Sequence, residues 1–203
     1  MKSMYQANKT HNRSLPPQHN RSLKTINGLT LVETLIVLAI FGLSLSFVGP
    51  NIQRFVAHSR IIAHLNDISA IIQHARVLAI NHHDTITLCP SPNFSRCSND
   101  WQQGIVVFID LNGNSIRDDE ELLLASSQKI PATEKVFGPN STIRFYDTGL
   151  NSSAASILIC PHNNDATLAR ALFISLQGST RVSKDENRDG VHDRRRGQNL
   201  ACI

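Results

Sequence analysis

One apolar stretch near the start of the chain, GLTLVETLIVLAIFGLSLSFVGP (residues 28–50), decides the fold. Between Leu29 and Gln53 there is no Lys or Arg, and Glu33 is the single charged residue. Leu29 to Pro50 is 22 residues, which makes a helix of roughly 33 Å at ~1.5 Å per residue, enough to span a bilayer. A carboxylate in hydrocarbon is unfavourable by about 2.5–3.5 kcal/mol, so Glu33 requires an explanation.

The apolar pattern continues beyond Pro50, but with a helical period of three and four residues. The apolar positions are Ile52, Phe55, Ile61, Ile62, Leu65, Ile68, Ile72, Ala75, Leu78 and Ala79. Polar residues such as Gln53, Arg60 and Asp67 fall between them. This spacing predicts an amphipathic helix. We therefore expect one long helix over about residues 30–80, with Gly42, Gly49 and Pro50 as possible points of bending.

The basic character of the chain belongs to its first segment. Residues 1–28 contain five basic and no acidic residues, whereas the rest contains 15 basic and 16 acidic residues. A basic segment before an apolar helix is typical of a leader that stays in the cytoplasm. The charge distribution argues against a globally basic nucleic-acid binder.

The sequence GLTLVETL at residues 28–35 resembles the class III signal of type IV prepilins and type II secretion pseudopilins. The resemblance implies that prepilin peptidase cuts between Gly28 and Leu29 and that Leu29 is then N-methylated. Counted from Leu29, Glu33 is the fifth residue and Pro50 the twenty-second, both typical of the family. The leader is longer than most, and Leu29 stands where Phe or Met is commoner.

The same resemblance gives Glu33 a role in assembly. Its carboxylate would face a free α-amine on a neighbouring subunit in the filament, so that neither charge stays unpaired in the apolar core. An accidental Glu near the start of a signal anchor is the alternative.

Residues 84–203 carry short β-type runs separated by turn residues. The runs are residues 85–88, 104–109, 141–145, 156–159 and 171–175. The predicted fold class is α+β, the type IV pilin fold, with an antiparallel β domain packed on the long helix. The expected organisation is a leader at 1–28, a transmembrane and filament-core helix at 29–52, an amphipathic helix at 53–83 and a periplasmic β-rich domain at 84–203.

Residues 87–124 are similar to the GspH/FimT family of minor pilins and pseudopilins. The matching residues follow a cysteine-bounded loop and are Trp101, Gly104, Val107, Phe108, Asp110, Asn112, Gly113 and Asn114. The family implies prepilin peptidase, other pilins or pseudopilins and the bacterial inner membrane as partners, and no small-molecule substrate.

Four cysteines, all beyond the apolar stretch, suggest two disulfides in a translocated domain. Of three possible pairings we prefer Cys89–Cys97, a short local loop, and Cys160–Cys202, which would hold the C-terminus. Four free thiols are the alternative, and the absence of C-x-x-C spacing argues against a metal site.

Two loops resemble calcium-binding loops. Residues 110–121 place oxygen-bearing side chains at positions 1, 3, 5, 9 and 12, but Ser115 replaces the glycine of position 6. A hairpin turn at Asn112-Gly113-Asn114 is the preferred interpretation there. Asp185, Asn187, Asp189 and Asp193 form D-x-N-x-D-G-x-x-D with Gly190 in place, but Arg196 stands at position 12. A solvated loop is preferred over calcium, so no cofactor is predicted.

The C-terminal region contains a basic cluster, namely Arg181, Lys184, Arg188, Arg194, Arg195 and Arg196. FimT-like minor pilins carry a G-R-x-R motif implicated in DNA binding for natural transformation, and residues 178–181 keep its glycine and last arginine. A phosphate-binding patch for double-stranded DNA is one interpretation. A solvated charged loop is the other, because four acidic residues lie among the six basic ones.

No nucleophile–base pattern, P-loop or zinc spacing indicates an enzyme. The sequence predicts a minor pilin of a type IV pilus, with possible DNA uptake. The alternative is a GspH-like minor pseudopilin of a type II secretion system with a purely structural role.

Overall fold

The computed structural model describes residues 28–140, 142–195 and 197–202, without the side chains of residues 46–51 and of Arg195. Of the leader expected at residues 1–28, only Gly28 falls within the described residues. The chain divides between Leu45 and Ser46 into two compact units.

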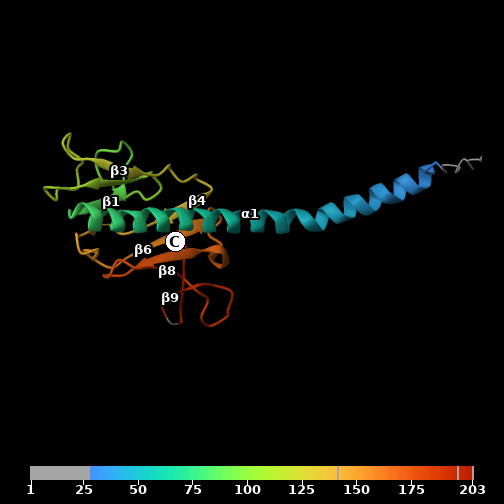
Figure 1. Cartoon of the computed structure of the whole chain (residues 1–203). Coiled ribbons are helices and arrows are strands. Elements are labelled where there is room, and N and C mark those ends of the chain that lie inside the picture. Colours follow the sequence, from blue (N-terminus) through green and yellow to red (C-terminus); the bar gives the residue numbers. More distant parts are fainter. Residues whose placement is uncertain (1–27, 141, 196, 203) are drawn as a thin grey trace, which may run out of the picture. The chain divides into compact units, whose positions relative to one another are not determined.

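Helix α1 runs from Leu31 to His82, 52 residues without interruption (Figure 1). The Oγ1 atom of Thr30 accepts the backbone N–H of Glu33, a typical cap at a helix N-terminus. The helix ends where His83 adopts a left-handed backbone conformation, with φ 56°. Gly42, Gly49 and Pro50 lie within α1 and do not end it. The prediction of one long helix is therefore confirmed.

The second half of α1 buries a narrow apolar stripe. Its fully buried residues are Ile61, Leu65, Ile68, Ile72, Ala75 and Ala79. Alternating steps of four and three keep these side chains on one face of the helix. Each Ile or Leu buried in this way contributes about 1.5–3 kcal/mol. This stripe is therefore the face of the second half of α1 that packs against the β domain.

The first sheet is antiparallel and four-stranded, in the order β3-β2-β1-β5. Its strands are β1 (Ile86–Pro90), β2 (Ile105–Ile109), β3 (Leu123–Ser126) and β5 (Ile143–Phe145). Ile86 pairs with Ile109 and Pro90 with Ile105, so β1 and β2 match along their full length. The sheet packs on the α1 stripe through buried side chains such as Leu88, Val107 and Phe145.

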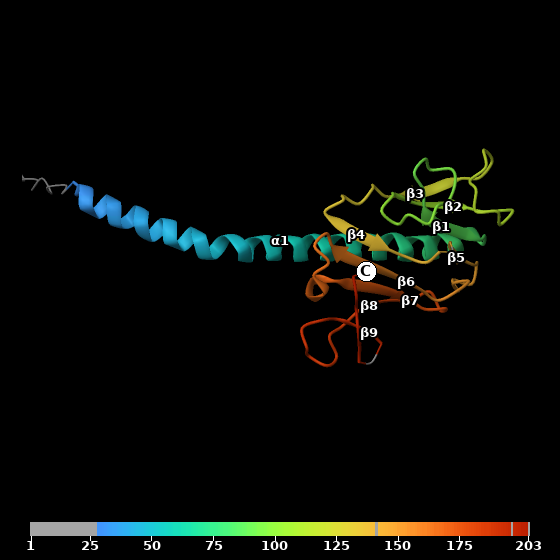
Figure 2. The same cartoon turned by 180° about the vertical axis from the view of Figure 1, so that it is seen from behind.

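The second sheet is also antiparallel and has the order β4-β6-β7-β8. Its strands are β4 (Glu134–Phe137), β6 (Ala155–Pro161), β7 (Arg170–Ile174) and β8 (Thr180–Val182). A short 3-10 helix, η1 (Ala166–Leu168), precedes β7. Ile157, Ile159 and Leu172 join the same core as the α1 stripe. Figures 1 and 2 show the second half of α1 flanked by the strands of both sheets.

The C-terminal segment forms a two-stranded ribbon, β9 (Asp193–Arg195) with β10 (Gln198–Asn199). A disulfide between Cys160 on β6 and Cys202 ties this segment to the second sheet. The other disulfide joins Cys89 on β1 to Cys97. These are the two pairs that the sequence analysis preferred.

The five predicted β-runs correspond to β1, β2, β5, β6 and β7, whereas β3, β4, β8, β9 and β10 were missed. The missed strands have two to four residues each. Leu123 to Ser126 has exposed or half-buried side chains throughout, so it lacks the alternation that marks a half-buried strand. The hairpin turn predicted at Asn112-Gly113-Asn114 lies within a longer connection, residues 110–122, between the paired strands β2 and β3.

Candidate functional site: the apolar helix half and the charged loops

The first half of α1 presents apolar side chains on every side. Its large apolar residues are each more than half exposed within their own unit: Leu31, Val32, Leu35, Ile36, Val37, Leu38, Ile40, Phe41, Leu43 and Leu45. A helix that is apolar all round is normally buried in lipid or in other protein chains.

Among the described residues, no helix combines the length and apolarity needed to cross a membrane.

Gly28, Leu29 and Glu33 lie together at the start of α1, and all three are exposed. Glu33 is in the first turn of the helix, where the partial positive charge of the helix dipole stabilises a carboxylate. Thr30 and Glu33 also have the spacing of a capping box, S/T-x-x-E. One of the two hydrogen bonds of that box is formed, because the N–H of Glu33 donates to Thr30 Oγ1 at 3.2 Å. Thr30 was not singled out from the sequence, although this spacing is a recognisable signal.

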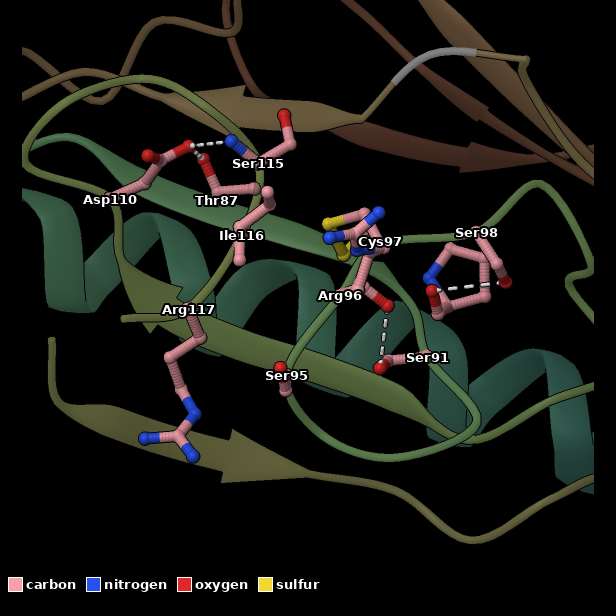
Figure 3. Close-up of a disulfide and its surroundings, with 12 residues drawn as sticks. Thr87, Ser91, Ser95, Arg96, Cys97, Ser98, Asp110, Ser115, Ile116 and Arg117 are labelled. Carbon is pink, nitrogen blue, oxygen red and sulfur yellow. Dashed lines mark hydrogen bonds between the residues drawn. A yellow bond between two sulfur atoms is a disulfide. The ribbon is translucent and has the colours of Figure 1, made fainter. Parts of the chain in front are cut away.

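Residues 110–121 are organised around a buried carboxylate. Asp110 is 2% exposed, and its Oδ2 accepts hydrogen bonds from Thr87 Oγ1 at 2.8 Å and from the N–H of Ser115 at 3.3 Å (Figure 3). The guanidinium of Arg144 on β5 lies 3.4 Å from the same oxygen and also donates to Gly113 O and Ser115 Oγ. Arg144 therefore supplies a positive charge to this loop, a role that its place in a β-run did not reveal.

The Cys89–Cys97 disulfide holds the neighbouring loop against this connection. Ser91 Oγ donates to the carbonyl of Arg96 at 2.8 Å (Figure 3), and Arg117 N donates to Ser95 O at 2.7 Å. Residues 91–98 and 110–121 thus form one loop system, joined by an isolated bridge between Arg96 and Ile116.

Residues 185–193 form a second acidic loop. The backbone N–H of Asp193 donates to the carbonyl of Lys184 and closes the base of the loop at 2.8 Å. Asp185 accepts N–H groups from Arg188, Asp189 and Gly190. The side chain of Asn199 donates to Asp189 and contributes most to lowering the pKa of that carboxyl, followed by the N–H of Val191 and the side chain of Asn187. Asp189 is therefore ionised at neutral pH.

The basic cluster is only partly gathered. Arg181 on β8 and Arg194 on β9 are exposed and line one hollow of about 570 Å³. The Arg181 guanidinium also lies 5.0 Å from the ring centre of Phe173 on β7, a cation–π contact. Lys184 and Arg188 are exposed but do not line this hollow. The Arg195 side chain and Arg196 lie outside what the structure describes.

Metal ligation by acids alone finds no support in the described part of the chain. Within residues 28–140, 142–195 and 197–202, no group of three or more His, Cys, Asp or Glu side chains is arranged to hold a metal ion.

The family model for GspH, the type II transport protein, matches residues 64–178. The match excludes the first half of α1 and ends at Gly178, before the acidic loop 185–193. No curated protein matches the sequence.

Three solved structures are similar to this chain. The type IV minor pilin FimU of Pseudomonas aeruginosa PAO1 in one crystal form has a TM-score of 0.51 at 18% identity, over 64% of this chain and 92% of that chain. A second crystal form of FimU has a TM-score of 0.46 at 19% identity, over 59% and 89% of the two chains. The minor pseudopilin EpsH from the type 2 secretion system of Vibrio cholerae has a TM-score of 0.46 at 6% identity, over 61% and 95%. At 18% identity, the similarity to the first FimU crystal form shows a shared fold. Nothing further is concluded from the other two structures.

Proposed function

The chain belongs to the GspH family of type II transport proteins, the minor pilins and pseudopilins, and from that premise we propose that it is a minor subunit of a type IV pilus or related pseudopilus. Prepilin peptidase cuts the precursor between Gly28 and Leu29, and Leu29 is N-methylated. Residues 29–52 hold the precursor in the bacterial inner membrane, with the β domain in the periplasm, until the subunit joins the filament.

The observation that carries this proposal is the exposure of the whole apolar surface of residues 31–45. An exposed apolar surface of this extent is unstable in water and is stabilised by lipid before assembly and by neighbouring helices afterwards. Glu33 lies at the start of this surface. Its carboxylate is placed to pair with the α-amine that cleavage creates on a neighbouring subunit.

Cleavage is tested by the fate of two variants. Gly28→Val is expected to leave the precursor uncut, because a branched side chain replaces the glycine that the peptidase recognises. Gly42→Val changes the same residue type within the helix and is expected to leave cleavage intact. Cutting of the Gly28→Val precursor at the normal rate would contradict this part of the proposal.

A second function, binding of double-stranded DNA, has one structural observation in its favour. Arg181 and Arg194 come from different strands yet line the same hollow, and both residues are exposed. Two such groups can contact phosphates without reading sequence. Lys184 and Arg188, and with them Arg195 and Arg196, would extend the contact along the duplex. This function would serve DNA uptake in competence, whereas the alternative is a purely structural subunit of a type II secretion system.

A further inference from the structure

The acidic loop 185–193 has the internal arrangement of a calcium-binding loop. Asp185 Oδ2 accepts the N–H of Gly190, five residues on, at 2.9 Å. Asn187 Oδ1 accepts the N–H of Asp189 at 3.1 Å, and Asp189 Oδ1 accepts that of Val191 at 2.9 Å. These bonds turn the side chains of alternate residues toward the inside of the loop, where calcium loops place ligands 1, 3 and 5.

The loop 110–121 repeats this arrangement. Asp110 Oδ2 accepts the N–H of Ser115, again five residues on. Asn112 Oδ1 accepts from Asn114 N, and Asn114 Oδ1 accepts from Ile116 N. In both loops the fourth and sixth residues have positive φ: 71° and 62° for Gly113 and Ser115 in this loop, 63° and 90° at the equivalent positions of the other.

The two loops differ in how their negative charge is balanced. In loop 110–121, the Arg144 guanidinium contacts Asp110 Oδ2, Gly113 O and Ser115 Oγ. In loop 185–193 there is no equivalent: among the described side chains, no Lys, Arg or His nitrogen lies within 4.0 Å of its acidic oxygens. The exposed side chains of Lys184, Arg188 and Arg194 form no such pair, although they adjoin the loop in sequence.

Asp193 provides the independent observation that points to a ligand. This residue is only 4% exposed. Its Oδ2 accepts the N–H of Glu186 at 2.7 Å, which holds the carboxylate beside the first turn of the loop. Its Oδ1 is buried and has no hydrogen-bond partner. The Oδ1 of Asp110 in the other loop is also buried without a partner, but there the Arg144 guanidinium lies 3.4 Å from the second oxygen of the same carboxylate, whereas no cation lies beside Asp193 among the described side chains. A buried, unpartnered carboxylate oxygen is strongly unfavourable unless a cation or donor satisfies it.

We propose that the loop Asp185–Asp193 binds one calcium ion through the side-chain oxygens of Asp185, Asn187, Asp189 and Asp193 and the backbone carbonyl of Val191. These are hard oxygen ligands at positions 1, 3, 5, 7 and 9, which suit calcium's flexible coordination better than the strict octahedron of magnesium. The three acids do not form a closed cage beforehand. Binding draws the exposed Asp189 carboxylate and the half-exposed Asp185 carboxylate inward around the anchored Asp193.

The affinity follows from the ligand set. Position 12, which carries a bidentate Glu in tight calcium loops, is Arg196 here. The site therefore lacks one carboxylate, and its dissociation constant is expected at about 10⁻⁴–10⁻³ M, the range of extracellular calcium modules. This inference does not rest on filament assembly or on DNA binding.

The test uses the full chain in detergent micelles after removal of metals with EDTA. Calorimetric titration with CaCl₂ is expected to show one site, and thermal unfolding to shift upward in about 10 mM CaCl₂, roughly ten times the weakest expected dissociation constant. MgCl₂ at equal concentration is expected to give a smaller shift.

Two variants locate the site. Asp189→Asn removes one exposed ligand charge and is expected to weaken binding at least about tenfold, and Asp185→Asn to act likewise. Asp118→Asn makes the same change at position 9 of loop 110–121 and is expected to leave the titration unchanged. The proposal is overturned if the wild-type chain shows no calcium-specific heat or shift, or if Asp118→Asn abolishes binding while Asp189→Asn retains it. Asp189 is exposed, so the variant's fold is expected to persist, which unchanged thermal unfolding in EDTA would confirm.

Discussion

Thr30 Oγ1 accepts the backbone N–H of Glu33 at 3.2 Å, so the acid in the apolar stretch is also the third residue of a capped helix. This position explains how the carboxylate is tolerated at the helix start before any partner subunit arrives, since the helix dipole stabilises a negative charge there. The capping position and the pairing role proposed for assembly are compatible. The first uses the backbone of Glu33 and the second its free carboxylate.

Glu33→Gln keeps the shape and the cap but removes the charge. It is expected to leave cleavage at Gly28–Leu29 unchanged and to lower the amount of subunit in sheared filaments at least about tenfold, because the neighbouring α-amine loses its partner. Asp67→Asn, an exposed acid on the same helix, is the control and should assemble normally. Equal recovery of the Glu33→Gln and wild-type subunits would argue against the pairing role.

The DNA hypothesis predicts a change in salt dependence. Replacing both Arg181 and Arg194 by Gln is expected to weaken binding of random-sequence duplex DNA. It should also reduce the slope of log K against log salt by about 2, since each phosphate contact contributes roughly 0.9. The measurement is a mobility-shift titration at two salt concentrations.

Arg60→Gln with Lys129→Gln is the matched control for the DNA experiment. Both residues are exposed and the net charge change is the same. If this pair reduces binding as much as the Arg181 and Arg194 pair, the effect belongs to net charge and the hollow is not the DNA site. Absence of any shift at low salt in the wild-type chain would remove the DNA function altogether.

The lowered pKa of the His192 ring predicts that the stability of the fold depends on pH. Burial of the His192 ring is the main cause that lowers its pKa below the ordinary value, and the positive charges of Arg170 and His58 lower it further. The hydrogen bond with the Ser183 backbone and the negative charge of Asp185 act in the opposite direction and raise it. In the unfolded chain the ring has a pKa of about 6.5. Below that pH the unfolded state takes up a proton that the folded state resists, so stability is fully present above it and falls as the pH drops.

The check is thermal unfolding between about pH 7.5 and 5, a window that brackets the unfolded-state pKa. His192→Gln is expected to flatten the dependence, while His74→Gln, which changes an exposed histidine of α1, should not. An unchanged pH profile in His192→Gln would show that another group is responsible.

A substitution at Gly138 tests the packing around the buried Trp101. A Cβ atom at Gly138 would lie 2.5 Å from three atoms of the indole ring, and Trp101 is 2% exposed with its Nε1 donating to Pro139 O. Gly138→Ala is expected to destabilise the fold by about 1–3 kcal/mol through overpacking. Chemical unfolding measures it, and adding Trp101→Phe should recover part of the loss if the clash is the cause.

Much of the fold was predictable because two long-range signals are strong in the sequence. The apolar run from Leu29 and the stripe from Ile61 to Ala79 define α1 without reference to other elements. The strands that were predicted, such as Ile105–Ile109, are those with buried β-branched side chains. The short strands β8 to β10 were missed because their pairing depends on partners elsewhere and on the Cys160–Cys202 disulfide, and their own side chains are mostly exposed.

The candidate sites were predictable in residue type but not in geometry. The spacing of Asp185 to Asp193 marked a possible calcium loop, but the absence of ion pairs there and the buried Oδ1 of Asp193 are visible only in three dimensions. Likewise, nothing in the sequence places Arg144 beside Asp110, since 34 residues separate them. The basic cluster appeared uniform in sequence, whereas among its described side chains only Arg181 and Arg194 line one hollow.

The central claim is that this chain is a processed filament subunit, and one measurement tests it most directly. That measurement is the intact mass of the chain recovered from sheared and washed surface filaments of its host. The account predicts a chain that begins at Leu29, carries one N-methyl group and retains both disulfides. A chain that still contains residues 1–28, or a filament fraction without this subunit while it accumulates in the membrane, would contradict the account.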